Sequence, residues 1–315
     1  MLRAFFSIVV SGLLVASAPA AAQDKLTLLL DWFINPDHGP LIVAQERGYF
    51  DAAGLDVSIV EPADPSAPPK LVAAGQADLA VSYQPQLHVQ VSEGLPLVRV
   101  GTLVATPLNS LVVLADGPIQ RIADLKGRKV GFSVGGFEEI VLGAMLRRNG
   151  LTLNDVELVN VNFSLSPSLI TGQVDAVIGA FRNFELNQMN IVGHPGAAFF
   201  PEEEGVPPYD ELILVAHRDI AESNVIRRFL DALEAATIWT INHPAAAWDL
   251  FRKTDKKLDD ELNRLAWIDT LPRLALRPAA LDTRRYDRFA TFMQESGMIS
   301  DTPPVPVYAI EVTGE

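Results

Sequence analysis

The sequence predicts an α/β protein of two lobes with a hinge and a cleft between them. Three observations lead to this fold class. Apolar runs of strand length alternate with helical segments, one short unit occurs twice, and polar and aromatic residues follow several predicted strands. Alternating strands and helices favour largely parallel sheets that are covered on both faces. The chain of 315 residues is long enough for about two domains.

The repeated unit reads LVAAGQADLAVSY at 71–83 and LITGQVDAVIGAF at 169–181. In each copy a Gly-Gln-Xaa-Asp turn leads into a small apolar run that ends on an aromatic residue. Upstream, the stretches 46–61 and 145–161 share a helix end, a glycine and a strand. The copies are about 96 residues apart, too far for a solenoid repeat, which indicates two similarly built lobes. Chance similarity between ordinary α/β units is the alternative.

The apolar patterns place the individual elements. Helix 39–48 is expected to be capped by Asp37, and the helix that begins at the prolines near 68 is expected to stop at Gly75. Strands are predicted at 25–30, 55–61, 78–82 and 128–132, and later helices at 140–150, 244–252, 258–268 and 283–296.

Two further strand-like runs, 109–118 and 211–219, are where we expect the chain to cross between the lobes. Lobe 1 is accordingly predicted at 23–112 and 215–315, and lobe 2 at 113–214. The first lobe is then assembled from both ends of the chain, and the two linking strands form the hinge. Ligands of open α/β sheets bind beyond the carboxyl ends of the strands, so the cleft is expected there.

The first 22 residues have the pattern of a secretory signal peptide. Arg3 precedes a short apolar run, and small residues including Ala20 and Ala22 flank a cleavage point before Gln23. The run is short for a membrane span, and an uncleaved anchor is the alternative. We therefore expect an exported protein located in the periplasm.

Composition excludes several classes of function. The chain has no cysteine, which removes thiol catalysis, cysteine-ligated metals and lipid attachment through an N-terminal cysteine. The formal net charge of −14 makes binding to nucleic acid or to anionic membranes unfavourable. No nucleotide-binding, hydrolase or zinc-protease motif occurs, and the five histidines lack metal-ligand spacing. We expect no catalytic residue, no metal, no cofactor and no enzyme activity.

Four stretches that follow predicted strands supply the candidate binding residues. Some have other interpretations: Trp32 as core, Tyr83 as a sheet cap, and Glu185 as an acid in the first turn of a helix. The glycine pair after Ser133 is equally typical of a turn. The expected ligand-binding residues are Trp32, Asn35, His38, Tyr83, Ser133, Gly135, Phe181, Asn183 and Glu185.

The chain resembles the NMT1/THI5-like group of periplasmic binding proteins, which serve ABC importers. The likeness covers about residues 25–220 and lies in LLDWFINPDHGPLIVAQERGYFDAAGLDVSIVE, AAGQADLAVSYQP, PLNSLVVL, DLKGRKVGF and GQVDAVIGAFRNFE. It implies the type II periplasmic binding protein fold, a monomer, and an ABC permease of the inner membrane as partner.

The resemblance also implies a ligand. The Asp-Trp, Asn and His arrangement at 31–38, and the aromatic-Xaa-Asn-aromatic-Glu pattern at 181–185, are similar to members that bind thiamine's pyrimidine precursors. Trp32 and Phe181 would stack on the ring, although relatives usually carry Tyr at the second position. Glu185 would hold the aminopyrimidine edge. The stretch SVGGFEE departs from the family's aromatic, glycine-rich pattern, which leaves recognition of the ring substituent open.

The leading hypothesis is thus a receptor for an aminopyrimidine precursor of thiamine. A receptor for riboflavin, or for sulfonate or nitrate, is the alternative within the same class. An anion receptor should present converging Arg or Lys, and the candidate stretches contain only Arg182. A pyrimidine synthase is the enzymatic alternative that the resemblance offers. Such enzymes carry a cysteine-rich iron-binding motif, which this chain lacks.

Overall fold

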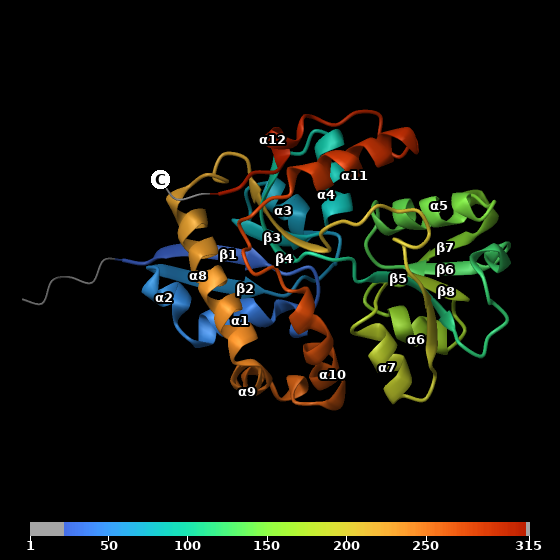
Figure 1. Ribbon diagram of the computed structural model, residues 1–315, viewed down its shortest axis with the longest axis horizontal. Coiled ribbons are helices and arrows are strands. Elements are labelled where there is room, and N and C mark those ends of the chain that lie inside the picture. Colours follow the sequence, from blue (N-terminus) through green and yellow to red (C-terminus); the bar gives the residue numbers. More distant parts are fainter. Residues whose placement is uncertain (1–21, 313–315) are drawn as a thin grey trace, which may run out of the picture.

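The computed structural model describes residues 22–312, which form two lobes side by side (Figure 1). Each lobe is built on one five-stranded sheet, with the orders β2-β1-β3-β10-β4 and β7-β6-β8-β5-β9. The predicted class, two α/β lobes, is confirmed. All but the last residue of the predicted signal peptide lies outside the described residues.

The strands of each sheet come from separate parts of the chain. The first sheet contains β1 (Asp24–Leu29), β2 (Leu55–Val60), β3 (Leu79–Ser82), β4 (Leu97–Val104) and β10 (Leu212–His217). The second sheet contains β5 (Asn109–Leu114), β6 (Lys129–Phe132), β7 (Glu157–Asn160), β8 (Ala176–Phe181) and β9 (Gly196–Phe199).

Each sheet is mixed rather than wholly parallel. β1 pairs in parallel with β2 and β3, and β6 with β7 and β8, as expected. β10 and β5 run antiparallel to both of their neighbours. These are the strands that arrive from the other lobe. They enter at the carboxyl ends of the other strands, as the pairing of Asn109 with Phe181 shows, and so must run the opposite way.

The crossings between lobes are short segments at 105–108 and 200–211. The boundaries expected at 112/113 and 214/215 fall inside β5 and β10. Each of these strands is hydrogen-bonded along its length into a single sheet, so the connections lie just before them. Both crossings therefore lie at the carboxyl ends of the parallel strands, where the cleft is expected.

The two sheets have the same architecture. Each strand of the first sheet has a counterpart at the same position in the second: β2 corresponds to β7, β1 to β6, β3 to β8, β10 to β5 and β4 to β9. The four glycines that mark the sequence repeat all have positive φ, at 71° and 68° in the first copy and 76° and 73° in the second. Only glycine adopts this conformation without strain, so the glycines end the same helices in both lobes. They are Gly54, Gly75, Gly150 and Gly172.

The aspartate of the repeated turn explains why the unit occurs twice. Asp78 accepts a hydrogen bond from the backbone N–H of Thr27 on β1, at 2.7 Å. Asp175 accepts the equivalent bond from Lys129 on β6, at 2.9 Å. Each aspartate also donates its own backbone N–H to the carbonyl of the same partner residue. The turn thereby fixes the following strand in register, β3 beside β1 and β8 beside β6.

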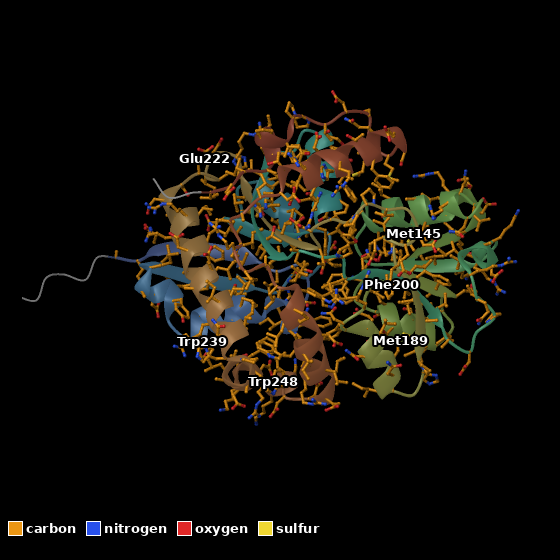
Figure 2. All side chains as sticks on the ribbon, in the orientation of Figure 1. Met145, Met189, Phe200, Glu222, Trp239 and Trp248 are labelled. Carbon is orange, nitrogen blue, oxygen red and sulfur yellow. The ribbon has the colours of Figure 1, made fainter. Side chains whose placement is uncertain are left out.

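Helices cover both faces of each sheet (Figure 1). In the first lobe one apolar cluster joins the sheet to α1, α2 and α8, and a second joins it to α3, α4, α11 and α12. In the second lobe Met145 of α5 and Met189 of α7 pack on opposite faces of the sheet (Figure 2). The α-helices are α1 (Gly39–Glu46), α2 (Tyr49–Ala52), α3 (Pro68–Ala73), α4 (Gln84–Ser92), α5 (Glu138–Arg148), α6 (Leu165–Ile170), α7 (Glu185–Ile191), α8 (Asn224–Asn242), α9 (Pro244–Thr254), α10 (Glu261–Thr270), α11 (Thr283–Glu295) and α12 (Val305–Tyr308).

Short 3-10 turns complete the two lobes. They are η1 (Pro36–His38), η2 (Ile122–Leu125), η3 (Leu153–Asp155), η4 (Lys256–Leu258) and η5 (Leu271–Arg273). Among the described residues, no helix combines the length and the apolar character needed to cross a bilayer.

Replacing Asp78 tests the turn that registers β3 against β1. We expect Asp78→Ala to lower the free energy of unfolding by about 1–2 kcal/mol, because Thr27 N–H loses a charged acceptor. Urea denaturation measures the change. Asp56→Ala, at an exposed position of β2, is the control and should alter stability by less than about 0.5 kcal/mol. Equal effects of the two substitutions would show that the turn aspartate has no special role.

Candidate functional site

A small cavity lies between the lobes at the carboxyl ends of the central strands. Its volume is about 30 Å³, enough for water but not for a heterocyclic ring. Side chains of the two lobes contact each other directly around it, so the lobes are closed on each other. The lining residues are Asp31, Trp32, Asn35, Asp37, Tyr83, Val134, Glu138, Leu165, Gly179, Phe181 and Leu212.

Aromatic rings from both lobes meet around this cavity. Tyr83 of the first lobe stacks on Phe137 of the second, with centroids 4.9 Å apart and planes inclined by 19°. Phe181 approaches Tyr83 edge-on at 6.5 Å. Trp32 packs edge-on against Phe163 of the second lobe at 4.6 Å. The aromatic residues that end the two copies of the repeat thus face each other across the cleft.

Asp31 is held by two partners within its own lobe. One carboxylate oxygen is 2.9 Å from Nε2 of His38, and the other accepts a hydrogen bond from the Tyr83 hydroxyl at 2.8 Å. The backbone N–H of Asn35 donates to Nδ1 of the same imidazole, which leaves the proton on Nε2 and directs it at Asp31. Burial and the adjacent Asp31 charge raise the pKa of Tyr83 well above its ordinary value. His38 is fully buried and supports Asp31 from behind.

Asp37 does not cap the helix, contrary to the expectation from sequence. The cap of the preceding 3-10 turn is Asn35, whose side chain accepts the Asp37 backbone N–H at 2.8 Å. Asp37 Oδ1 instead accepts bonds from Asn183 of the second lobe and Thr270 of the first, both at 2.7 Å. Burial raises the pKa of Asp37 to about 6, although these two bonds lower it. We call Asp37, Asn183 and Thr270 the interlobe latch.

Two weaker connections flank the latch. Asn187 of α7 donates to Asp269 of α10 at 2.9 Å, on the exposed side of the cleft. The backbone N–H of Gly135 donates to the Ser66 hydroxyl at 3.2 Å, again from the second lobe to the first. With the lobes closed, the Gly135 N–H is therefore bonded to the opposite lobe.

Glu138 is a second buried acid that lines the cavity, and it comes from the second lobe. Its Oε2 accepts the backbone N–H of Ser133 at 2.7 Å, and burial raises its pKa well above the ordinary value. Gly179, at φ 96°, lies directly beneath the carboxylate, and a Cβ at that position would overlap it. The Ser133 hydroxyl donates to the carbonyl of Asn162 and is not free for a ligand.

Glu185 begins α7 and lies behind Phe181. Its Oε2 accepts the backbone N–H of Phe181 at 2.7 Å, which holds that ring at the cavity wall. Burial, and to a smaller extent the charge of Asp37, raises the pKa of Glu185 to about 8. Glu185 is thus close enough to Asp37 for the two acids to interact, but it does not line the closed cavity.

The structure brings the nine predicted residues into one region and divides them into two groups. Trp32, Asn35, Tyr83 and Phe181 line the cavity. The others support those walls or join the lobes, and these are His38, Ser133, Gly135, Asn183 and Glu185.

Three acids that line the cavity are not among the expected ligand-binding residues: Asp31, which belongs to the Asp-Trp pattern at 31–38, Asp37 and Glu138. Asp31 directly follows β1, as Trp32 does, and that position was a usable signal. Glu138 belongs to the SVGGFEE stretch after β6, where nothing in the sequence tells which of two adjacent glutamates points inward. Within residues 22–312 no group of His, Asp and Glu side chains is arranged to hold a metal ion.

Comparison with known proteins assigns the family. The NMT1/THI5-like family pattern matches residues 35–247. The chain belongs to this family.

Three relatives show the range of the family. A Haemophilus influenzae protein, whose name provisionally assigns it to thiamine biosynthesis, is 54% identical over 98% of both chains. A formylaminopyrimidine-binding protein of Halalkalibacterium halodurans is 37% identical over 72% of this chain and 69% of its own. A 4-amino-5-hydroxymethyl-2-methylpyrimidine phosphate synthase of Schizosaccharomyces pombe is 26% identical over 77% of this chain and 73% of its own.

Solved structures share the fold. An alkanesulfonate-binding protein of Xanthomonas axonopodis pv. citri, bound to MOPS, superposes with a TM-score of 0.72 over 92% of this chain and 99% of its own, at 16% identity. The predicted type II periplasmic binding protein fold of this NMT1/THI5-like protein is confirmed.

Substituting Asn183 tests the interlobe latch. Asn183→Ala removes the bond from the second lobe to Asp37, and a hydrogen bond to a buried acid contributes about 1.5–3 kcal/mol. We expect the ligand-free variant to be more open than the parent, with a larger radius of gyration in small-angle X-ray scattering. Asn190→Ala, at an exposed position of the following helix α7, is the control. Identical scattering from all three proteins would contradict the latch.

The buried acids predict the direction of pH dependence. The pKa of Glu185 rises from 4.5 to about 8 on folding, so the folded state binds the proton more tightly. Its contribution to stability therefore falls as the pH rises from about 4.5 to about 8. Glu185→Gln retains an acceptor for Phe181 N–H and removes the carboxyl group that causes this pH dependence.

We expect the variant to lose less stability than the parent between pH 5 and pH 8, by more than about 1 kcal/mol in urea denaturation. Glu157→Gln, at an exposed site on β7, should follow the parent. A steeper pH dependence in Glu185→Gln would refute the assignment.

Proposed function

We propose that the protein is the periplasmic solute-binding component of an ABC importer and captures an aminopyrimidine precursor of thiamine. The observation that carries the proposal is the composition of the cavity wall. Aromatic rings from both lobes line it together with three carboxyl groups, and no Lys or Arg is among the lining residues. A flat heteroaromatic ring with amino groups matches such a wall, because it stacks through its faces and donates from its edge.

The contribution of each group follows from its chemistry. Offset stacking on an aromatic side chain contributes about 0.5–1.5 kcal/mol beyond the burial of area. A carboxylate accepts from an exocyclic amine in a charge-assisted bond, and an analogue without the amine would leave that acid unpaired. Trp32, Tyr83 and Phe181 supply the rings in this proposal. Asp37 supplies an acceptor. Glu185 does not line the closed cavity, and in this proposal it reaches the amino edge of the ligand when the lobes move apart to hold the ring.

The relatives support the same ligand class. The Halalkalibacterium protein is named for binding a formylaminopyrimidine, and the Haemophilus protein is named for thiamine biosynthesis. An alkanesulfonate ligand, as in the structurally similar Xanthomonas protein, would place an anion against three carboxyl groups. Charge therefore disfavours a sulfonate or nitrate receptor, and the proposal excludes both.

Opening and closing deliver the ligand in this proposal. The lobes part at the crossings 105–108 and 200–211, admit the ring and close through the interlobe latch. The closed monomer then presents both lobes to a permease of the inner membrane. The signal peptide predicted at 1–22 accounts for export to the periplasm. Pyrimidine synthases are more distant relatives, and the absence of cysteine removes the iron-binding motif that the enzymatic interpretation requires.

Calorimetric titration with 4-amino-5-hydroxymethyl-2-methylpyrimidine tests the proposal. We expect saturable 1:1 binding, a change in tryptophan fluorescence, and no binding of an alkanesulfonate or nitrate. Phe181→Ala should weaken binding by about tenfold through loss of one stack, and Glu185→Ala should abolish it. His194→Ala, in an exposed loop, is the control. Absence of heat and of a thermal shift with every aminopyrimidine would refute the proposed ligand class.

A further inference from the structure

The first lobe fixes one end of each crossing with a single arginine. Arg285 of α11 donates from Nη1 to the carbonyl of Ala105, at 2.7 Å, and the same nitrogen forms an ion pair with Asp210. Asp210 also accepts hydrogen bonds from the hydroxyl groups of Thr102 and Tyr286, both of the first lobe. Ala105, at the start of the first crossing, and Asp210, near the end of the second, therefore move with this lobe.

The second lobe fixes the other end of each crossing in the same way. Arg182, directly after β8, donates to the carbonyl of Asn109 at 3.2 Å and makes a bidentate ion pair with Glu202, at 2.6 and 3.0 Å. Glu204 accepts a further bond from Asn149, at the end of α5, at 2.9 Å. Each crossing is thus bound to one lobe at its start and to the other lobe at its end.

Bending between the lobes is therefore confined to residues 106–108 and 205–209, and three polar atoms next to these stretches lack partners. Within the described part of the chain no group forms a hydrogen bond with Nδ2 of Asn109, Oε1 of Glu211 or the hydroxyl of Tyr209. All three residues are fully buried. A buried polar atom without a partner is less stable than the same atom in water or in a hydrogen bond. The closed form therefore carries a free-energy cost at its hinge.

The unpaired atoms are complementary and lie on opposite sides of the bend. Asn109 belongs to the second lobe, where its Oδ1 accepts the N–H of Gly179, and its own N–H donates to Oε2 of Glu211 at 2.9 Å. The free donor of Asn109 is thus near the free acceptor of Glu211, which moves with the first lobe. Burial, and then the charge of the nearby Glu211, raises the pKa of Tyr209 well above its ordinary value, although its hydroxyl has no hydrogen bond in the closed form. A change in the angle between the lobes changes the spacing of all three atoms.

From these contacts we propose that the hinge is biased toward the open form, because closure leaves Asn109, Tyr209 and Glu211 with unpaired polar atoms that find partners when the lobes part. In the open form the donors of Asn109 and Tyr209 bond to Oε1 of Glu211 or to water that enters the hinge. The interlobe latch acts in the opposite direction, and the ligand offsets the remaining cost.

The inference rests on the proposed function and deepens it, since it names residues that set how easily the receptor closes. Tyr209 does not line the cavity. In this proposal its hydroxyl nonetheless lowers the affinity for the ligand, because a receptor that binds on closing loses affinity in proportion to the scarcity of its closed form.

Tyr209→Phe tests the proposal, because it removes the unpaired hydroxyl and keeps the ring that packs against Phe289. Small-angle X-ray scattering of the mature protein, residues 23–315, measures opening without any ligand. We expect the radius of gyration of the parent to exceed the value calculated from the closed structure. The radius of gyration of Tyr209→Phe should be smaller than that of the parent.

Tyr308→Phe is the matched control. Tyr308 is an equally buried tyrosine inside the first lobe, and its hydroxyl lies 3.3 Å from Nδ1 of His88, away from the crossings. This variant should scatter like the parent. Circular dichroism checks the folding of both variants. If Tyr209→Phe fails to fold, the parent decides: a ligand-free parent as compact as the closed structure overturns the open bias, and a more open parent supports it.

Calorimetry with 4-amino-5-hydroxymethyl-2-methylpyrimidine gives a second readout. We expect Tyr209→Phe to bind at least about threefold more tightly than the parent, because less of the binding free energy offsets the cost of closure. Tyr308→Phe should bind as the parent does.

The outcomes separate this inference from the proposed function. Equal radii of gyration for the parent and Tyr209→Phe, or weaker pyrimidine binding by Tyr209→Phe, overturn the hinge bias and leave the receptor role intact. Absence of pyrimidine binding in all three proteins counts against the proposed ligand, and scattering still decides the hinge bias.

Discussion

The whole site depends on how the two crossings between the lobes are joined. Glu211, at the end of the second crossing, accepts the backbone N–H groups of Leu108 and Asn109 at 2.6 and 2.9 Å, at the end of the first. The residue is fully buried, and burial raises its pKa to about 7. One side chain thus holds together two segments that lie about 100 residues apart in the chain. Each crossing enters its sheet at the carboxyl ends of the parallel strands. Because the two crossings are joined, the carboxyl ends of the parallel strands in one sheet face those in the other.

This arrangement explains why a duplicated unit produces a single site. In the first lobe the repeated turn registers β3 beside β1 through Asp78, and in the second lobe it registers β8 beside β6 through Asp175. The aromatic residue at the end of that strand then points toward the other lobe. Tyr83 and Phe181 come within 6.5 Å of each other only because the sheets are joined edge to edge in this way. A duplication without the paired crossings would leave two separate aromatic residues and no cleft.

Buried acids concentrate in the same region. Burial raises the pKa of Asp37, Glu138, Glu185 and Glu211, and all four lie in the cleft or at the crossings. Glu139, next to Glu138, also has a raised pKa. The remaining carboxyl groups with shifted pKa values are exposed or half-buried, and their pKa values are lowered. An arginine favours the charged form of three of them, and the hydroxyl and backbone N–H of Thr152 favour that of Asp155. Acids that are buried without a cation reduce stability, and such groups are typical of functional sites. Closure of the lobes is therefore favourable only when a ligand or the interlobe latch supplies hydrogen-bond donors to these carboxyl groups.

The two-lobed class and the repeated turn were determined by the sequence alone, because periodicity and turn chemistry act between residues close in the chain. The glycines at Gly75 and Gly172 and the aspartates after them are of this local kind. Tertiary structure decided which acids reach the ligand space. Asp37 pairs with Asn183 across 146 residues instead of capping its own helix, and Glu138 rather than its neighbour turns inward. Such choices depend on the packing of two lobes against each other, and no local pattern in the chain encodes them.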